Sequence, residues 1–302
     1  MMDKDVVDSS SEQSIRYGED ITVVIATIGE KSLAATVESI ISGSVVPLKI
    51  LLCIPNEIAM RVSYLSTAYE CVEVLPTAQK GQVIQRILGF QRSNTKYTLQ
   101  LDSDVIVDRY LVENLANALE FNPRSCVGPV IYRNDTKKIY SFLSADCIMY
   151  HGYQKKIITW ILNGTDGYKS GLISRGGIGF GPDLAGDDTE VQWLPGCCIM
   201  HKTKNLILEN FYSQQGKAYA EDLYHSHYIR QTGVKMMYDK ASKVHVSFPE
   251  VRLIDVISIF KMQYDSYKAL LGFVKLTGKS AIRISLYVIV NMSFLFINQI
   301  FH

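Results

Sequence analysis

Strand-like and helix-like patterns alternate along the first half of the chain. The β-branched run at residues 21–27 predicts a buried strand, and apolar positions at helical spacing within 33–41 predict the helix that follows it. Residues 48–54 repeat the strand pattern. A strand, a helix and a second strand in this order predict a β-α-β unit with parallel strands, whose ligands gather where the strands end.

The alternation continues for another 60 residues or so of sequence. Residues 71–75 and 97–101 have strand patterns, and residues 83–90 and 110–120 have helical ones. This order excludes an all-β or a bundle architecture. It predicts an α/β fold with a mostly parallel central sheet and helices on both of its faces.

The segment 141–188 breaks the alternation because it is rich in glycine and polar residues. We expect a mobile loop here, either a lid or substrate-binding segment or a disordered excursion. Its Gly176-Gly177-Ile178-Gly179 run does not follow a strand of a β-α-β unit. It is therefore not a convincing dinucleotide-binding fingerprint.

The region 251–302 predicts helices of amphipathic and then apolar character. Apolar clusters from residue 260 onward alternate with five cations, which only Asp265 opposes: Lys261, Lys268, Lys275, Lys279 and Arg283. The last stretch, 284–301, is apolar but includes three amides and lies near the lower limit of roughly 17–25 residues for a spanning helix. We expect an interfacial or partner-docking helix, although ordinary packing on the domain explains the same pattern.

Composition and charge narrow the class of protein. With 302 residues, 47% of them apolar, the chain can bury one large core and carry an appendage. The net charge of +1 provides no general attraction for nucleic acid. Six cysteines without metal-ligand spacing indicate a reducing compartment, and residues 1–13 lack signal-peptide features, so we expect a cytoplasmic protein.

Asp102 and Asp104 come directly after a predicted strand, at the edge where a ligand is expected. Two carboxylates there suit Mg²⁺ or Mn²⁺, which take oxygen ligands and leave positions open for the oxygens of a diphosphate. The alternative is that an aspartate after a strand merely stabilises a turn.

Three further features have both a chemical and a structural interpretation. Glu221 and Asp222 precede a predicted helix, where Asp222 can serve as a general base or simply stabilise the helix start. Lys80 and Arg86 flank another helix start. They can bind phosphate oxygens there, or they can simply belong to a solvated face of the helix. His245 lies in a short strand pattern, and a lone histidine is more often structural than a metal ligand.

Taken in order, these pieces over residues 21–246 resemble the family 2 glycosyltransferases. That resemblance implies a GT-A domain at 19–250, with a nucleotide-binding half at about 19–130 and an acceptor-binding half at about 131–250, after a polar and flexible terminus at 1–18. It implies nucleotide-sugar binding by Ala26, Thr27, Glu30, Glu57, Lys80, Arg86, Asp102 and Ser103. It implies acceptor binding by Trp193, Gly196 and Glu221, a general base at Asp222, and metal ligands at Asp104 and His245.

The resemblance also implies a reaction. A single sugar is expected to pass from a nucleotide sugar, with a UDP-sugar the first choice, to a glycan or lipid-linked acceptor, with inversion and with Mn²⁺ or Mg²⁺. Separately, the basic amphipathic pattern of the C-terminal region leads us to expect that the chain works at the inner face of the cell membrane, held peripherally by that region. The tail lacks the Gln-X-X-Arg-Trp motif of processive synthases, and this absence favours single-sugar addition. Cys53-Ile-Pro-Asn-Glu57 stands where many members have an aspartate cluster that touches the base, so the identity of the donor stays open.

Two other functions remain open at the level of sequence. A sugar nucleotidyltransferase also combines an α/β sheet, a divalent ion and a basic phosphate site. Its glycine-rich signature should follow the first strand, and Thr27-Ile-Gly-Glu-Lys31 matches it poorly. A non-catalytic, membrane-associated scaffold with the same fold would show no metal-dependent nucleotide binding.

Overall fold

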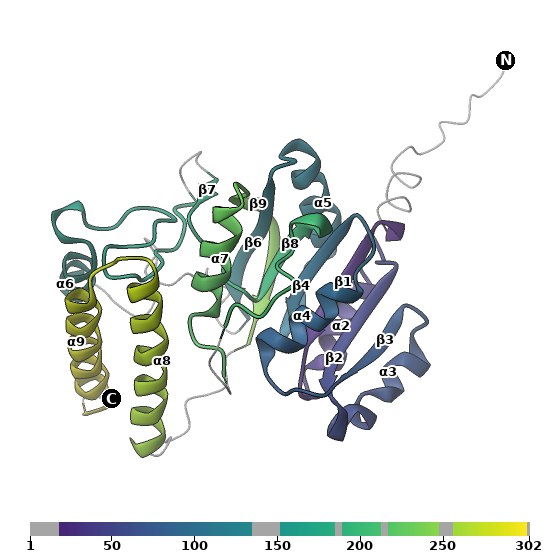
Figure 1. Ribbon diagram of the computed structural model, residues 1–302, viewed down its shortest axis with the longest axis horizontal. Coiled ribbons are helices and arrows are strands. Elements are labelled where there is room, and N and C mark those ends of the chain that lie inside the picture. Colours follow the sequence, from purple (N-terminus) through teal and green to yellow (C-terminus); the bar gives the residue numbers. More distant parts are fainter. Residues whose placement is uncertain (1–17, 135–151, 185–188, 213–216, 248–255, 301–302) are drawn as a thin grey trace.

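The computed structural model describes residues 18–134, 152–184, 189–212, 217–247 and 256–300 (Figure 1). A twisted sheet covered by helices occupies one side of the molecule, and a group of three helices from two distant parts of the chain occupies the other. The predicted α/β fold class is confirmed.

Four parallel strands form the first half of the sheet, in the order β3-β2-β1-β4. They are β1 (Ile21–Ala26), β2 (Lys49–Pro55), β3 (Val72–Thr77) and β4 (Tyr97–Asp102). Every residue of β1 is buried, as expected for a central strand with both faces covered. Ala26 lies opposite both Cys53 and Asp102, so these strands end level at one edge of the sheet.

Helices cover both faces of this parallel half. They are α2 (Leu33–Ile41), η1 (Asn56–Arg61), α3 (Ser63–Ala68), α4 (Gln82–Arg92) and α5 (Leu111–Phe121). Alternate residues of a strand point to opposite faces. Val23 accordingly packs in the core with α2 and α5, whereas Val24 packs with Phe90 of α4. Gly89 lets α4 approach closely, since a side chain there would clash with Val24.

The second half of the sheet mixes strand directions. Its strands are β5 (Val105–Val107), β6 (Ser125–Arg133), β7 (Glu190–Val191), β8 (Cys198–Lys202) and β9 (Lys235–Val246). β8 runs antiparallel between β4 and β6, and β6 pairs in parallel with β9. β9 also forms antiparallel pairs with β5 and β7. The predicted parallel pairing therefore dominates only the first half. The short η3 (Thr203–Asn205) and the helix α7 (Glu221–Gln231) connect β8 to β9.

The prediction of a mobile loop at 141–188 is wrong for residues 152–184. This part forms α6 (Gly152–Asn163), the turn η2 (Gly164–Asp166) and a segment that contributes buried Phe180 to a second core. Its glycines permit close packing: a side chain at Gly179 would clash with Trp193, and one at Gly171 would clash with Val191. Residues 141–151 and 185–188 lie outside the described part of the chain, as do residues 1–17 of the predicted flexible terminus.

The C-terminal region forms two helices, α8 (Val256–Leu276) and α9 (Ala281–Ile300). They share the second core with α6, where Leu162, Phe273 and Ile284 are fully buried. Among the described helices, none has the length and apolar character needed to cross a bilayer. Segments separated by about a hundred residues of sequence thus make one helical unit beside the sheet.

Candidate active site

The site lies where β1, β2 and β4 end, and Gln85 of α4 holds that edge together. This buried side chain donates hydrogen bonds to the carbonyl oxygens of Thr27 (2.9 Å) and Cys53 (2.7 Å). Its Oε1 accepts one from the backbone N–H of Gly81 at 3.0 Å. Gln85 therefore fixes the start of α4 to the ends of two strands, a positioning role that no local sequence pattern indicated.

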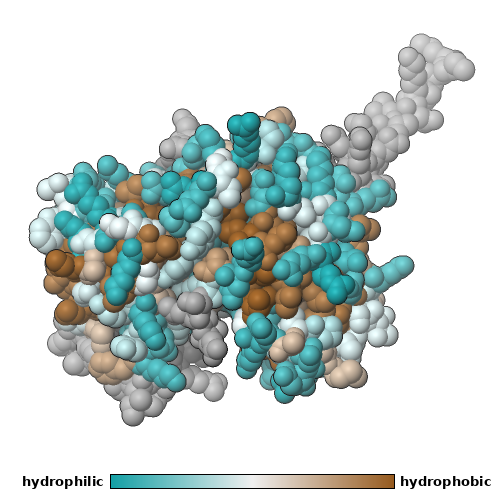
Figure 2. All heavy atoms as spheres, in the orientation of Figure 1, coloured by the Kyte–Doolittle hydropathy of each residue, from teal (hydrophilic) through white to brown (hydrophobic). Residues whose placement is uncertain are grey.

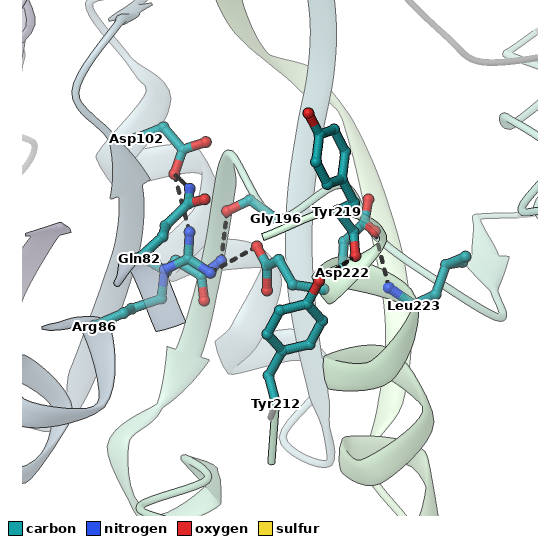
Figure 3. Close-up of polar contacts among 10 residues, drawn as sticks. Gln82, Arg86, Asp102, Gly196, Tyr212, Tyr219, Asp222 and Leu223 are labelled. Carbon is teal, nitrogen blue, oxygen red and sulfur yellow. Dashed lines mark hydrogen bonds and ion pairs between the residues drawn. The ribbon is translucent and has the colours of Figure 1, made fainter. Parts of the chain in front are cut away.

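Arg86 joins two distant parts of the site. Its side chain is only 3% exposed; Nη2 donates to Asp102 Oδ1 at 2.9 Å and Nη1 donates to Glu221 Oε1 at 2.8 Å (Figure 3). Although burial alone opposes its charge, the two carboxylates raise the pKa of Arg86. Both Nη groups thus bind protein carboxylates, one of them 135 positions away in sequence, and the predicted role of Arg86 in nucleotide-sugar binding stays a prediction.

Two side chains of α4 bind one of the two carboxylate oxygens of Asp102. Oδ1 accepts hydrogen bonds from Arg86 and from Gln82 Nε2, the latter at 3.0 Å. Among the described residues, none donates a side-chain hydrogen bond to the second oxygen. Burial raises the pKa of Asp102 to about 6, and the charge of Arg86 acts in the opposite direction.

Three residues predicted to bind the nucleotide sugar contact one another. Glu30 Oε2 accepts hydrogen bonds from Thr27 Oγ1 at 2.5 Å and from Ser103 Oγ at 3.0 Å. Thr27 Oγ1 in turn accepts from the N–H of Gly29, which has φ of 77°. The loop after β1 is therefore tied directly to the Asp102-Ser103-Asp104 turn.

Asp104 faces solvent beyond this turn. Its carboxylate accepts no hydrogen bond from another described side chain. Partial desolvation and the nearby Glu30 raise the pKa of Asp104, and the charge of Lys217 opposes that change. Lys217, which sequence reasoning did not single out, therefore lies within electrostatic reach of the predicted metal ligand.

Asp222 lies at the first turn of α7. Ala220, just before the helix, adopts the left-handed conformation with φ of 56°, and Asp222 Oδ1 accepts a hydrogen bond from the N–H of Leu223 at 2.9 Å. Burial raises the pKa of Asp222 to about 7, with a further contribution from the charge of Glu221. A carboxylate with this pKa can accept a proton near neutral pH.

Cys197 is hydrogen-bonded to Asp102 through the backbone. Its carbonyl accepts a hydrogen bond from the N–H of Asp102 at 2.9 Å. Burial raises the pKa of its thiol, and the charges of Asp102, Asp104 and Asp222 all raise it further. The thiol thus lies within electrostatic reach of both acidic pairs, a position that the scattered cysteine pattern had not distinguished from that of an ordinary core thiol.

Gly196 lies against Glu221, and both are residues predicted to bind the acceptor. Its carbonyl accepts a hydrogen bond from buried Gln100, and a side chain at this position would clash with Glu221 Oε1. Tyr212 secures the segment before α7 by donating its hydroxyl to the Tyr219 carbonyl at 2.6 Å, beside Asp222 (Figure 3). The two tyrosines were not anticipated from sequence.

Other predicted site residues lie apart from this group. Trp193 is 6% exposed and donates its indole N–H to the Phe180 carbonyl at 2.8 Å, so it packs in the second core, a placement that does not favour contact with an acceptor. Glu57 and Lys80 are exposed, on η1 and just before α4. Their binding roles stay predictions.

His245 lies on β9, opposite Ile106 of β5. Its Nε2 is 2.9 Å from Asp108 Oδ1. In the part of the chain that the structure describes, no three His, Cys, Asp or Glu side chains form a ready-made metal site. The assignment of His245 as a metal ligand therefore stays a prediction.

Comparison of the sequence with protein-family models gives one match. Residues 22–171 match the model described as glycosyl transferase family 2. This range includes the loop after β1, α4 and the turn with Asp102 and Asp104, but it ends before Glu221 and Asp222. No curated protein matches the chain in sequence.

Solved structures share the fold. The crystal structure of GalNAc-T7 with UDP, GalNAc and Mn²⁺ aligns with a TM-score of 0.57 and 15% sequence identity. The alignment covers 85% of this chain but 48% of that one, so this chain spans about half of the length of its structural relative. At this identity the similarity establishes a common GT-A architecture.

Proposed function

Because this chain belongs to the family 2 glycosyltransferases and has a GT-A fold, we propose that it transfers a single sugar, with inversion, from a nucleotide sugar to a glycan or lipid-linked hydroxyl. The observation that carries this proposal is the convergence on Arg86. That side chain binds Asp102 and Glu221 together. These contacts link the segment that holds Asp104, two residues after Asp102, to the segment that holds Asp222, next to Glu221, and so support one shared site.

The donor would bind at the edge formed by β1 and β4. Asp104 and the unused oxygen of Asp102 are hard oxygen ligands, which fit Mn²⁺ or Mg²⁺ together with phosphate oxygens. Such an ion would neutralise charge on the leaving diphosphate. Exposed Lys80 and Lys217 would offer their charges to the diphosphate, whereas both Nη groups of Arg86 bind protein carboxylates. The structural relative was crystallised with UDP and Mn²⁺, which supports a UDP-sugar as the first donor to test.

Asp222 is the proposed general base. As the acceptor oxygen forms its bond to the anomeric carbon, the bond from that carbon to the diphosphate breaks, and the acceptor proton passes to Asp222. A carboxylate with a pKa of about 7 is well matched to this task near neutral pH. One direct displacement inverts the anomeric centre and needs no covalent intermediate.

Calorimetric titration tests the donor part of the proposal. UDP, GDP and dTDP are each added to the parent, with and without Mn²⁺, and then to Asp104→Ala and to Glu38→Ala, an exposed carboxylate on α2. We expect one nucleotide to bind in a Mn²⁺-dependent way, and Asp104→Ala alone to lose that binding. Binding by none of the nucleotides contradicts the proposal. Release of pyrophosphate from a sugar phosphate and a nucleoside triphosphate would identify a nucleotidyltransferase instead.

A further inference from the structure

An apolar stripe lies on the exposed face of α9. Ile282, Leu286 and Ile289 recur at the spacing that places residues on one side of a helix, and Ile282 and Ile289 are 74% and 62% exposed. The opposite side of α9 holds buried Ile284 and Tyr287, which belong to the second core. The stripe is therefore not part of the core that holds the helical unit together.

A second stripe with the same spacing lies on α6. Tyr153, Ile157 and Trp160 are exposed, Tyr153 to 81% and Trp160 to 63%. Tyrosine and tryptophan favour the boundary between lipid and water, because each combines an apolar ring with a polar group. Exposed Lys156 shares this face of the helix.

The two helices lie beside each other, although about 120 residues separate them in sequence. Arg283 of α9 donates hydrogen bonds to the carbonyl oxygens at the end of α6, to Ile161 at 2.7 Å and to Trp160 at 3.2 Å. Figure 2 shows hydrophobic side chains at the left edge of the molecule, where Figure 1 places α6 and α9. The two stripes therefore lie on neighbouring helices, and we call them together the α6–α9 face.

Positive charge is concentrated in the helical unit that carries the α6–α9 face. Lys261, Lys268 and Lys275 recur every seven residues, so they share one exposed side of α8. Residues 152–184 and 256–300 together contain nine lysine and arginine residues against three aspartates, whereas the whole chain carries a net charge of only +1. The cationic excess is thus concentrated in the helical unit that bears the apolar stripes.

We propose that the α6–α9 face, with the lysines of α8, docks the protein on an anionic phospholipid bilayer without spanning it. The apolar stripes would enter the boundary between headgroups and acyl chains, and the lysines would meet lipid phosphates. A second copy of the chain fits this surface less well, because a symmetric dimer would bring two cationic faces together.

Docking of this kind has a consequence for catalysis, which rests on the proposed function. Tyr224 of α7 donates its hydroxyl to the Ala269 carbonyl of α8 at 2.9 Å, and a side chain at Gly272 would press on that hydroxyl. The helix that begins at Glu221 and Asp222 therefore packs directly on the docking unit. A lipid-linked acceptor would be presented close to the general base.

Vesicle sedimentation tests the docking surface. The full chain is mixed with vesicles of phosphatidylcholine, alone or with phosphatidylglycerol. We expect the parent to bind the mixed vesicles preferentially, and the triple variant Ile282→Ser/Leu286→Ser/Ile289→Ser to bind at least tenfold more weakly. Met60→Ser/Phe121→Ser replaces exposed apolar residues on η1 and α5 and should bind like the parent. Lys261→Gln/Lys268→Gln/Lys275→Gln should lose the preference for phosphatidylglycerol.

The proposal fails if the parent sediments with neither vesicle at low salt, or if the triple variant binds as the parent does. Thermal unfolding of each variant shows whether the fold is intact, and the single replacement Trp160→Ala gives a milder second probe, expected to weaken binding several-fold. If light scattering finds a dimer that the triple variant dissociates, without lipid binding by the parent, a second copy covers this face instead. Because the readout is binding to lipid, it is independent of donor and acceptor chemistry.

Discussion

The acidic pair at the end of β4 and the acidic pair at the start of α7 are built alike, although one follows a strand and the other opens a helix. In each pair one carboxylate binds Arg86, namely Asp102 or Glu221. The other member, Asp104 or Asp222, does not. Arg86 therefore binds one member of each pair, and the other member is the one that we propose acts on a ligand.

Asp102 and Asp222 differ in the groups that surround their carboxylates. Asp102 accepts hydrogen bonds from Arg86 and Gln82, and its pKa rises only to about 6. Asp222 accepts one from the N–H of Leu223, with Glu221 beside it, and its pKa rises to about 7. The comparison teaches that burial raises the pKa of both carboxylates, that the charge of Arg86 opposes this rise at Asp102, and that the charge of Glu221 adds to it at Asp222.

Replacing the proposed base should have the largest effect. Asp222→Asn keeps the shape of the side chain but cannot accept the proton, so transfer should fall by about 10²- to 10⁴-fold. Nucleotide affinity should change little, since the donor edge is untouched. Product formation and calorimetry measure the two quantities separately; transfer at the parent rate would remove Asp222 from the mechanism.

Replacing Arg86 should remove its ion pairs with Asp102 and Glu221 at the same time. Arg86→Met leaves Asp102 and Glu221 without their cation in a buried site, and the free energy of unfolding should fall by about 3–5 kcal/mol. Lys49→Met is the control, because Lys49 and Glu73 form a 2.8 Å ion pair that is more than 40% exposed. It should cost less than about 1 kcal/mol. Urea unfolding measures the free energy of unfolding of both variants. Equal decreases would show that the ion pairs of Arg86 stabilise the fold no more than an exposed ion pair does.

Altering the unpaired member of the β4 pair should affect the ligand rather than the fold. Asp104→Ala should weaken Mn²⁺-dependent nucleotide binding at least about tenfold, equivalent to roughly 1.4 kcal/mol. Its thermal unfolding should stay close to that of the parent, because Asp104 faces solvent. If the variant retained metal-dependent binding, the metal would have to be held by other groups.

The pH dependence should reveal the raised pKa of Asp222. Below about pH 7 the transfer rate should fall about tenfold per unit, because protonated Asp222 cannot act as a base. The sign for stability is opposite: the protonated form is favoured in the folded state, so this contribution is full below the unfolded pKa of about 3.9 and is lost as pH rises through about 7. Rate profiles and unfolding of parent and Asp222→Asn measure both, and a flat rate from pH 5 to 8 would contradict the assignment.

The sequence was sufficient to predict the strands and the longer helices of the parallel half, the position of Asp102 at a strand end and that of Glu221 at a helix start, but not β6, β8 or α6. β-branched runs are buried strands here, and Asp102 lies at a strand end for the reason its position indicated. The role of the glycines was harder to predict. A glycine-rich segment looks the same in sequence whether it forms a flexible loop or packs closely, as Gly179 does against Trp193. Gln85 likewise has an ordinary helical position and acts through strand ends far away in sequence.

Local patterns determined the alternation of strands and helices, because the spacing of apolar side chains depends only on neighbours along the chain. Tertiary structure alone decided which charged groups meet. Arg86 and Glu221 are 135 positions apart, and nothing in the spacing of either segment encodes their contact. Burial then makes the pairing obligatory, since a guanidinium in the interior requires carboxylates around it, and those carboxylates come from whichever segments the packing of the sheet and α7 brings together.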